Sequence, residues 1–192
     1  MRRIFALAAV AALLLGSCAS APEPQDTQDS LVSGYITLDF VDGFFNMGPR
    51  VLKSGLSVTF EKEGSGETVT ARTDSEGLFA FASGGGGRWV LRSIRYEEKV
   101  ADNTFTGGPN LGFSFDVEPG SIAYIGDLTV VYADPEQTDH STRGSTKTRS
   151  YNYDISLRHA HDAGRFSSYL QTKFSDSGWL GRPVKEVKLQ SN

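Results

Sequence analysis

The chain has 192 residues, enough for one domain with a hydrophobic core of its own. It is slightly acidic, with 23 Asp and Glu against 19 Lys and Arg, and its basic residues are scattered along the sequence. A nucleic-acid-binding protein needs a clustered basic face, so the composition argues against that class. Because Cys18 is the single cysteine, no disulfide can form within the chain and a cluster of thiolate metal ligands is excluded.

The N-terminal segment has the features of a bacterial export signal. Arg2 and Arg3 precede an apolar run over residues 4–15, which is too short to span a bilayer as a helix, since that takes about 20 residues. The sequence Leu15-Gly16-Ser17-Cys18 then resembles the lipobox of bacterial lipoproteins. This resemblance implies cleavage before Cys18, a thioether-linked diacylglycerol on its sulfur and, in many such proteins, a further acyl chain on its amine. Two or three acyl chains hold a protein stably on a membrane.

The residues around the cleavage site bear on the destination of the mature chain. Ala19 stands where the lipoprotein family places the aspartate that retains members in the inner membrane, so the resemblance implies the outer membrane of a two-membrane cell. Ala19-Ser20-Ala21 is also an A-x-A site, and an ordinary secretory signal cut after Ala21 is the alternative. Removal of residues 1–17 takes away two arginines and leaves 17 basic and 23 acidic residues, a net charge of −6.

Composition divides the mature chain into four segments. Residues 18–30 contain the acylated N-terminus followed by proline, glutamine and aspartate without a large apolar residue, which predicts a flexible tether. Residues 31–132 show the alternation and the turn signals of a β-domain. Residues 133–149 are polar and predict an exposed loop, and residues 150–192 predict a C-terminal extension of one strand and a short helix.

Apolar residues alternate with polar ones along short stretches of the β-domain. The clearest stretches are 35–40, 56–61 and 113–117, each with an apolar side chain at every second position. Gly64-Ser65-Gly66 and Pro119-Gly120 supply turns after two of them. Short strands separated by such turns predict a mainly β protein, an antiparallel β-sandwich of about seven strands.

Residues 73–91 contain a strand–turn–strand pattern that is found in a known family. The sequence Thr-Asp-Ser-Glu-Gly-Leu-Phe-Ala-Phe over residues 73–81 is followed by glycines at 84–87 and then by Trp89-Val90-Leu91. It is similar to the carboxypeptidase regulatory-like, or prealbumin-like, β-sandwich family, although Trp89 replaces the usual tyrosine and Arg88 separates it from the glycines. The resemblance implies a fold, and it implies no activity because its motifs mark strands and turns.

The C-terminal extension shows two further patterns. Residues 151–157 alternate, with Tyr, Tyr, Ile and Leu on one predicted face of a strand. Asp162 can cap a helix whose apolar stripe consists of Phe166, Tyr169, Leu170 and Phe174. We expect this helix to end near Ser177-Gly178, to cover a face or an edge of the sheet, and to be followed by Trp179 and Leu180 packing back onto it.

Few residues have a spacing that points to metal or catalytic chemistry. His159 and His161 stand at i and i+2, so both rings point the same way on a strand, but zinc needs further ligands and only the isolated His140 is available. We expect Asp74 to hydrogen-bond local backbone amides in a turn, since the alternating carboxylates of a calcium loop are missing. The glycines at 84–87 lack the Lys-Ser/Thr of a phosphate-binding loop. We therefore predict no metal site, no cofactor and no enzyme activity.

Three hypotheses for function remain. The favoured one is a membrane-anchored, non-catalytic interaction or structural module of the cell envelope. It is marked by an exposed apolar patch on a strand edge or at Phe44-Phe45, unless that pair plugs one end of the sandwich, and by the absence of a polar-lined cleft. A glycan- or peptidoglycan-binding module instead predicts a concave face with exposed Trp89 or Trp179. An enzyme based on histidine-bound metal predicts that His159 and His161 converge with His140 or a carboxylate.

Overall fold

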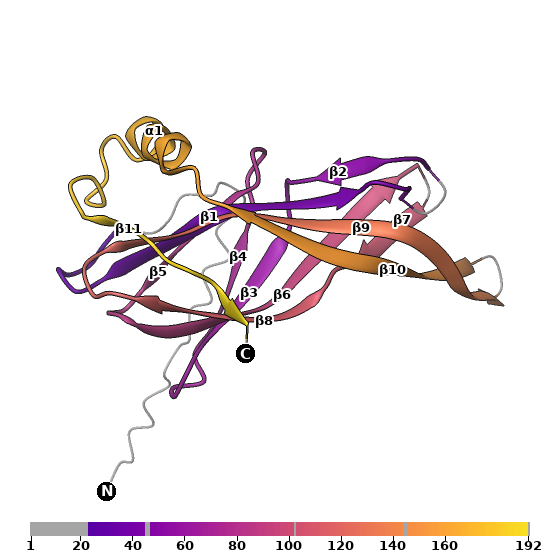
Figure 1. The fold of residues 1–192 in the computed structure, drawn as a ribbon, viewed down its shortest axis with the longest axis horizontal. Helices are drawn as coiled ribbons and strands as arrows, with labels where there is room; N and C mark the ends of the chain where they lie inside the picture. The colour runs from indigo at the N-terminus through magenta and orange to yellow at the C-terminus, as the bar shows by residue number, and fades with distance from the viewer. Residues whose placement is uncertain (1–22, 45–46, 102, 144–145, 192) are drawn as a thin grey trace, which may run out of the picture.

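The computed structural model describes residues 23–44, 47–101, 103–143 and 146–191. In this part of the chain, twelve strands and one helix form two facing β-sheets with the helix on one outer face (Figure 1). The prediction of a mainly β protein with a sandwich architecture and a short C-terminal helix is confirmed. Cys18 and Phe45, on which two of the sequence-based predictions depend, lie outside the described residues.

The first sheet is mixed and contains both N-terminal and C-terminal segments. Its strands are β1 (Ser30–Phe40), β2 (Arg50–Leu52), β5 (Leu78–Ser83), β9 (Ile122–Arg143), β10 (Thr146–Ala160) and β11 (Val184–Glu186). The order is β10–β9–β1–β2, with β5 beside the first half of β1 and β11 beside the start of β9. β9 pairs in parallel with both β1 and β11, whereas the other pairs are antiparallel.

The second sheet is antiparallel throughout the described residues. Its strands are β3 (Ser57–Lys62), β4 (Thr68–Arg72), β6 (Gly87–Val100), β7 (Asn103–Gly107), β8 (Asn110–Val117) and β12 (Gln190–Ser191). The order is β12–β8–β6–β3–β4, and β7 pairs with the distal half of β6. Residues 150–192 are therefore an integral part of the sandwich, since they contribute strands to both sheets.

The main core lies between the two sheets and is rich in aromatic rings. Along β1, the predicted alternation holds: Ile36, Leu38 and Phe40 point inward and are fully buried. Phe60 on β3 contacts aromatic rings from both sheets, with Phe81 on β5 at a centroid distance of 4.9 Å. Burying such a side chain contributes roughly 1.5–3 kcal/mol, so the sandwich is stabilised by packing without a disulfide.

The helix α1 (Ala163–Lys173) covers the outer face of the first sheet, as predicted. Asp162 caps it by accepting a hydrogen bond from the Arg165 amide at 2.9 Å. Its apolar stripe is buried, and the Phe166 ring stacks on Tyr124 of β9 at a centroid distance of 4.4 Å. Within the described residues, no helix is long and apolar enough to cross a bilayer.

The end of the helix differs from the prediction. The helix stops at Lys173 because the Ser-Asp-Ser stretch at 175–177 has side chains that compete for backbone hydrogen bonds. Trp179 packs back and is fully buried, as expected. Leu180 is exposed, contrary to the expectation, because the turn in which Arg182 donates its amide to the Trp179 carbonyl directs Leu180 outward.

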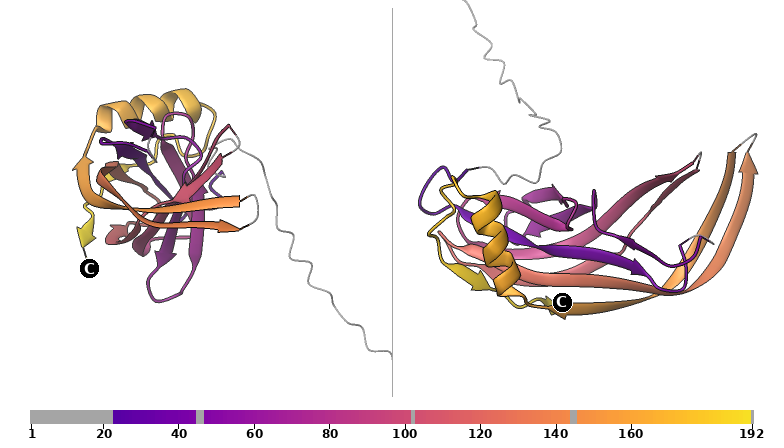
Figure 2. Two further views of the ribbon diagram at one scale, coloured as in Figure 1. Left: turned by 90° about the vertical axis from the view of Figure 1, so that its right-hand side faces the viewer. Right: turned by 90° about the horizontal axis from the view of Figure 1, so that it is seen from above.

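The predicted loop over residues 133–149 is wrong for residues 133–143 and 146–149, which form the distal parts of β9 and β10. This hairpin projects beyond the sandwich and is curved (Figure 2). Both of its faces meet water, so it needs no apolar residues, and its threonines favour extended backbone. Two register shifts between the strands, together with a positive φ of 47° at Asp134, account for the curvature, because bulges bend and twist a strand.

The second half of the predicted tether is also ordered. Within residues 23–29, Asp26 and Asp29 accept hydrogen bonds from nearby backbone amides and fix local turns. The Arg182 guanidinium donates to the carbonyls of Asp26, Thr27 and Asp29. The flexible tether predicted over residues 18–30 is thus wrong for residues 23–29, which dock on the C-terminal segment.

Candidate functional site

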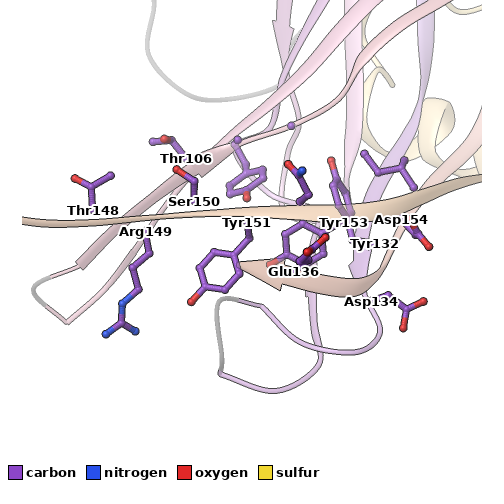
Figure 3. Close-up of a pocket in the computed structure, with 15 residues that line it drawn as sticks. Thr106, Tyr132, Asp134, Glu136, Thr148, Arg149, Ser150, Tyr151, Tyr153 and Asp154 are labelled. Carbon is purple, nitrogen blue, oxygen red and sulfur yellow. The ribbon is translucent and has the colours of Figure 1, made fainter. Parts of the chain in front are cut away.

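A groove of about 780 Å³ lies between the β9–β10 hairpin and the base of the β6–β7 hairpin (Figure 3). These two hairpins extend from the same end of the sandwich (Figure 1). One wall comes from the backbone of β7 and its following turn, and the other from β9 and a continuous stretch of β10. The lining residues whose side chains enter the argument are Tyr96, Tyr132, Arg149, Tyr151, Tyr153 and Ile155, with the acidic Asp134, Glu136 and Asp154.

The aromatic floor of the groove follows from the strand register. Tyr132 on β9 stands directly opposite Ile155 on β10, so both side chains lie on the inner face of the sheet. The Tyr132 ring stacks on Phe40 at a centroid distance of 4.4 Å, and Tyr153 meets both rings edge-on at 5.5 Å. The core of the sandwich therefore continues into the floor of the groove.

The hydroxyls of Tyr96 and Tyr132 in this floor are neutral at physiological pH. Burial raises the pKa of Tyr96 and of Tyr132 well above the ordinary value of 10. The Tyr132 hydroxyl is buried and has no hydrogen-bond partner among the described residues, although buried polar groups are normally paired. It is therefore an unpaired polar group beneath the surface of the groove.

The rim of the groove is acidic. The lining contains three carboxylates, on Asp134, Glu136 and Asp154, and one guanidinium, that of Arg149. Arg149 and Tyr151 extend from the same side of β10 (Figure 3). The Asp134 amide is held by the Asp42 carboxylate at 3.1 Å, which fixes the point where β9 leaves the sandwich. An apolar and aromatic floor with an acidic rim favours binding of an apolar chain that carries positive charge.

The histidines predicted as metal candidates lie elsewhere. The rings of His159 and His161 contact each other with centroids 4.7 Å apart, and His159 donates Nε2–H to the Ile125 carbonyl at 2.6 Å. His159 pairs with Leu128 on β9, whereas His140 stands twelve residues further along that strand, about 40 Å away. No group of three or more His, Cys, Asp or Glu residues that could hold a metal ion occurs in the described part of the chain.

The aromatic candidates from the sequence are in the core. Trp89 and Trp179 are both fully buried, so neither offers an exposed face for stacking on a sugar. Phe44 is fully buried too, with its ring 4.7 Å from that of Phe40 and 5.5 Å from that of Phe105. Phe44 thus plugs one end of the sandwich, while its neighbours Met47 and Val51 remain exposed.

Two turns behave as their sequences predict. The Asp74 carboxylate accepts hydrogen bonds from the amides of Glu76 and Leu78, both at 2.9 Å, and also from the Tyr169 hydroxyl of the helix. The glycines at 84–87 connect β5 to β6, and thus join a strand to a strand. Asp74 thus stabilises its turn, and the glycines at 84–87 form the connection between two strands.

Sequence reasoning missed the groove and two of its central residues. The common face of residues 151–157 was visible as alternation, and the structure confirms it. Tyr96 and Tyr132 gave no separate signal, because each lies in an ordinary alternating strand. Only the pairing of β9 with β10 brings Tyr132 to Tyr153.

No family model, no curated protein and no solved structure matches this chain. The resemblances to the lipobox and to the carboxypeptidase regulatory-like family therefore stay predictions.

Proposed function

We propose that this protein is a lipoprotein of the bacterial cell envelope, anchored through acyl chains on Cys18, whose sandwich presents the groove as a non-catalytic interaction site. One observation supports this function more than any other: the docked N-terminal segment and the groove lie at opposite ends of β1. Ser30 begins this strand beside the docked segment and Phe40 ends it beneath Tyr132. Eleven residues of strand correspond to about 35 Å.

The anchor and the docked segment together place the domain close to the membrane. Four residues separate Cys18 from Glu23, so these two residues lie at most about 18 Å apart. The Glu23 carboxylate accepts the Gly178 amide at 2.8 Å, and this hydrogen bond lowers the pKa of Glu23 together with one from Ser177. The anchored end of the sandwich then faces the lipid, and the groove faces away from it. The resemblance to lipoproteins at Ala19 implies that this lipid is the outer membrane.

The surface around the groove supports interaction with an envelope partner. Ile155 and Leu157 on β10 are exposed large apolar residues on a strand edge, which is one of the two marks expected for an interaction module. The other expected mark, the absence of a polar-lined cleft, is not met, because the groove has a largely polar lining. The glycan-binding alternative has weaker support, because both tryptophans proposed for stacking are buried. A glycan ligand would have to use the partly exposed rings of Tyr151 and Tyr153 instead.

The anchor is tested by expressing the full chain in a bacterial host beside a Cys18→Ala variant. We expect a membrane-bound product whose intact mass begins at Cys18 and includes acyl chains, and a loss of both properties in the variant. A soluble wild-type product that begins near Pro22 would contradict the anchor and identify a secreted protein.

The interaction role is tested on the anchored protein by chemical cross-linking in intact cells. We expect cross-linked complexes to be lost when Ile155→Lys places a charge beside the groove. Val51→Lys is the matched control, because Val51 is equally exposed, at 53% against 50%, on the opposite edge strand of the same sheet. Complexes that persist unchanged in Ile155→Lys would show that the groove is not the interaction site.

A further inference from the structure

The C-terminal segment closes one half of the seam between the two sheets. β11 adds to β9 on the side where β10 also pairs, and four residues later β12 adds to β8 on the other sheet. Between them, Val187 and Leu189 pack against the main core. The chain thus uses an extended segment of its own to cover the part of this seam that lies between β9 and β8.

The other half of the seam, between β10 and β7, is open along the groove. Within the described residues, β10 pairs only with β9, and β7 pairs only with β6, so each strand leaves one edge unpaired on this side. Unpaired edges present rows of backbone N–H and C=O groups, which can accept another strand. The groove runs along both edges, with Thr106 and Gly107 on one wall and β10 on the other.

Two apolar side chains on β10 point inward and yet are exposed. Ile155 and Leu157 stand opposite Tyr132 and Val130, which are core residues, and opposite residues in an antiparallel pair share a face. Ile155 and Leu157 are nevertheless 50% and 37% exposed, because no strand of the second sheet lies beneath them in the described structure. An inward-facing apolar side chain without cover is the geometry of a site that a further strand completes.

We propose that an extended segment of a partner polypeptide adds to the free edge of β10 and fills this seam. The inference rests on the proposed interaction role of the groove and specifies its ligand. Backbone hydrogen bonds to β10 would supply affinity, and alternate apolar side chains of the segment would cover Ile155 and Leu157. The acidic rim selects positive charge on the intervening side chains.

The dimensions of the site set the length of the segment. The groove is lined continuously by β10 from Thr148 to Ile155, and Leu157 extends the apolar face by two residues. At about 3.3 Å per residue, a segment of about ten residues spans positions 148–157. A second copy of the chain fits less well, because pairing β10 with itself would bring the acidic side chains of two grooves together.

The test uses the full mature chain carrying Cys18→Ala, so that acylation plays no part. The probe is a fluorescent decapeptide of alternating valine and lysine, and its binding is followed by fluorescence anisotropy. Two matched peptides replace valine by serine or lysine by glutamate. We expect both to bind at least about tenfold more weakly than the valine–lysine peptide. The serine peptide lacks the apolar side chains that would cover Ile155 and Leu157, and the glutamate peptide lacks the positive charge that the acidic rim would attract.

Variants locate the binding site and show whether the peptide adds as a strand. Ile155→Lys and Leu157→Lys should each weaken binding at least about tenfold, while Val51→Lys leaves it unchanged. Having two variants guards against one that fails to fold, and thermal unfolding checks each. Hydrogen exchange should show slower exchange of β10 amides when the valine–lysine peptide is bound, which contact through side chains alone would not produce.

Four results of the binding and exchange experiments would overturn the inference. They are no binding up to about 1 mM peptide, equal binding by all variants, protection confined to strands other than β10, and binding of soluble peptidoglycan fragments in place of the peptide. A dimer in sedimentation that Ile155→Lys dissociates would assign the seam to a second copy and overturn it as well. None of these results bears on Cys18 acylation, so failure here is distinguishable from failure of the anchor.

Discussion

Arg182 lies over the buried indole ring of Trp179, with its guanidinium carbon 4.9 Å from the ring centroid. From this position it reaches the backbone carbonyls of the N-terminal segment, including that of Asp26 at 2.7 Å. The two residues therefore connect the helix end to the residues that precede β1. Because Trp179 is fully buried, it holds the guanidinium on a rigid support.

Arg182→Ala should release the docked segment. Loss of hydrogen bonds to three carbonyls removes about 1–3 kcal/mol of local stability, so the amides of residues 25–29 should exchange at least about tenfold faster. Hydrogen exchange read by mass spectrometry measures this directly. Arg158→Ala, at an exposed position on β10, is the control and should leave the exchange of this segment unchanged.

Phe44→Ala should destabilise the sandwich strongly, because Phe44 fills the end of the core against Phe40 and Tyr96. We expect a loss of about 3–5 kcal/mol in the free energy of unfolding, measured by urea titration. Met47→Ala, at an exposed position of the same loop, should change it by less than about 0.5 kcal/mol. Equal effects of the two substitutions would mean that Phe44 does not plug the core.

Gly126→Ala should disrupt the bulge at which β9 changes register against β1. Gly126 has a φ of +85°, and an added Cβ would lie 2.5 Å from the Ala160 carbonyl oxygen and 2.8 Å from His159 Nε2. We expect a loss of about 2–4 kcal/mol in urea titration. Gly112→Ala on β8 meets no atom within 4 Å and should be nearly neutral, so similar losses in both variants would contradict this prediction.

Segments of this fold were predictable from the sequence where they bury one apolar face in the core. The alternation along residues 35–40 and the cap at Asp162 are local patterns, and both predicted their elements correctly. The distal part of the β9–β10 hairpin, residues 133–143 and 146–149, was missed because its polar faces leave no apolar period, although its backbone is paired. Docking of residues 23–29 was missed because it depends on Arg182, more than 150 residues away in the sequence.

The groove was unpredictable for a related reason. Tyr96, Tyr132 and Tyr153 come from three strands, and a sequence pattern assigns each to an inner face without saying which strands are neighbours. Their meeting depends on the parallel pairing of β1 with β9 and on the register of β10. The open seam also depends on where the C-terminal strands stop, which no composition signal marks.

Tyr132→Phe removes a buried hydroxyl that has no hydrogen-bond partner among the described residues. We therefore expect the free energy of unfolding at pH 8 to stay the same or to rise by up to about 1 kcal/mol. Tyr124→Phe is the contrasting variant, because the Tyr124 hydroxyl donates to Asp127 at 2.5 Å, and its loss should destabilise by about 1 kcal/mol. Urea titration of both variants checks the pair. A destabilised Tyr132→Phe would show that this hydroxyl has a partner in solution.

Stability should fall steeply as the pH rises above 10. Burial raises the pKa of Tyr35 to about 12 and moves the pKa of Tyr96, Tyr124, Tyr132 and Tyr169 in the same direction. A raised pKa in the folded state means that the unfolded chain loses its protons first, at the ordinary value near 10. The stabilisation is therefore complete below pH 10 and is lost as the pH rises toward the folded-state values, by at most about 1.4 kcal/mol per pH unit for each tyrosine.

Urea titrations between pH 8 and about pH 11, with tyrosinate absorbance recorded in parallel, measure this dependence. A Tyr96→Phe and Tyr132→Phe double variant removes two of the five groups, so its unfolding midpoint should fall less steeply with pH than that of the wild type. If the two proteins lose stability along parallel curves, the alkaline transition arises from groups other than the tyrosines in the floor of the groove. Tyrosinate absorbance that rises near pH 10 in the folded protein would likewise show that these hydroxyls are open to solvent.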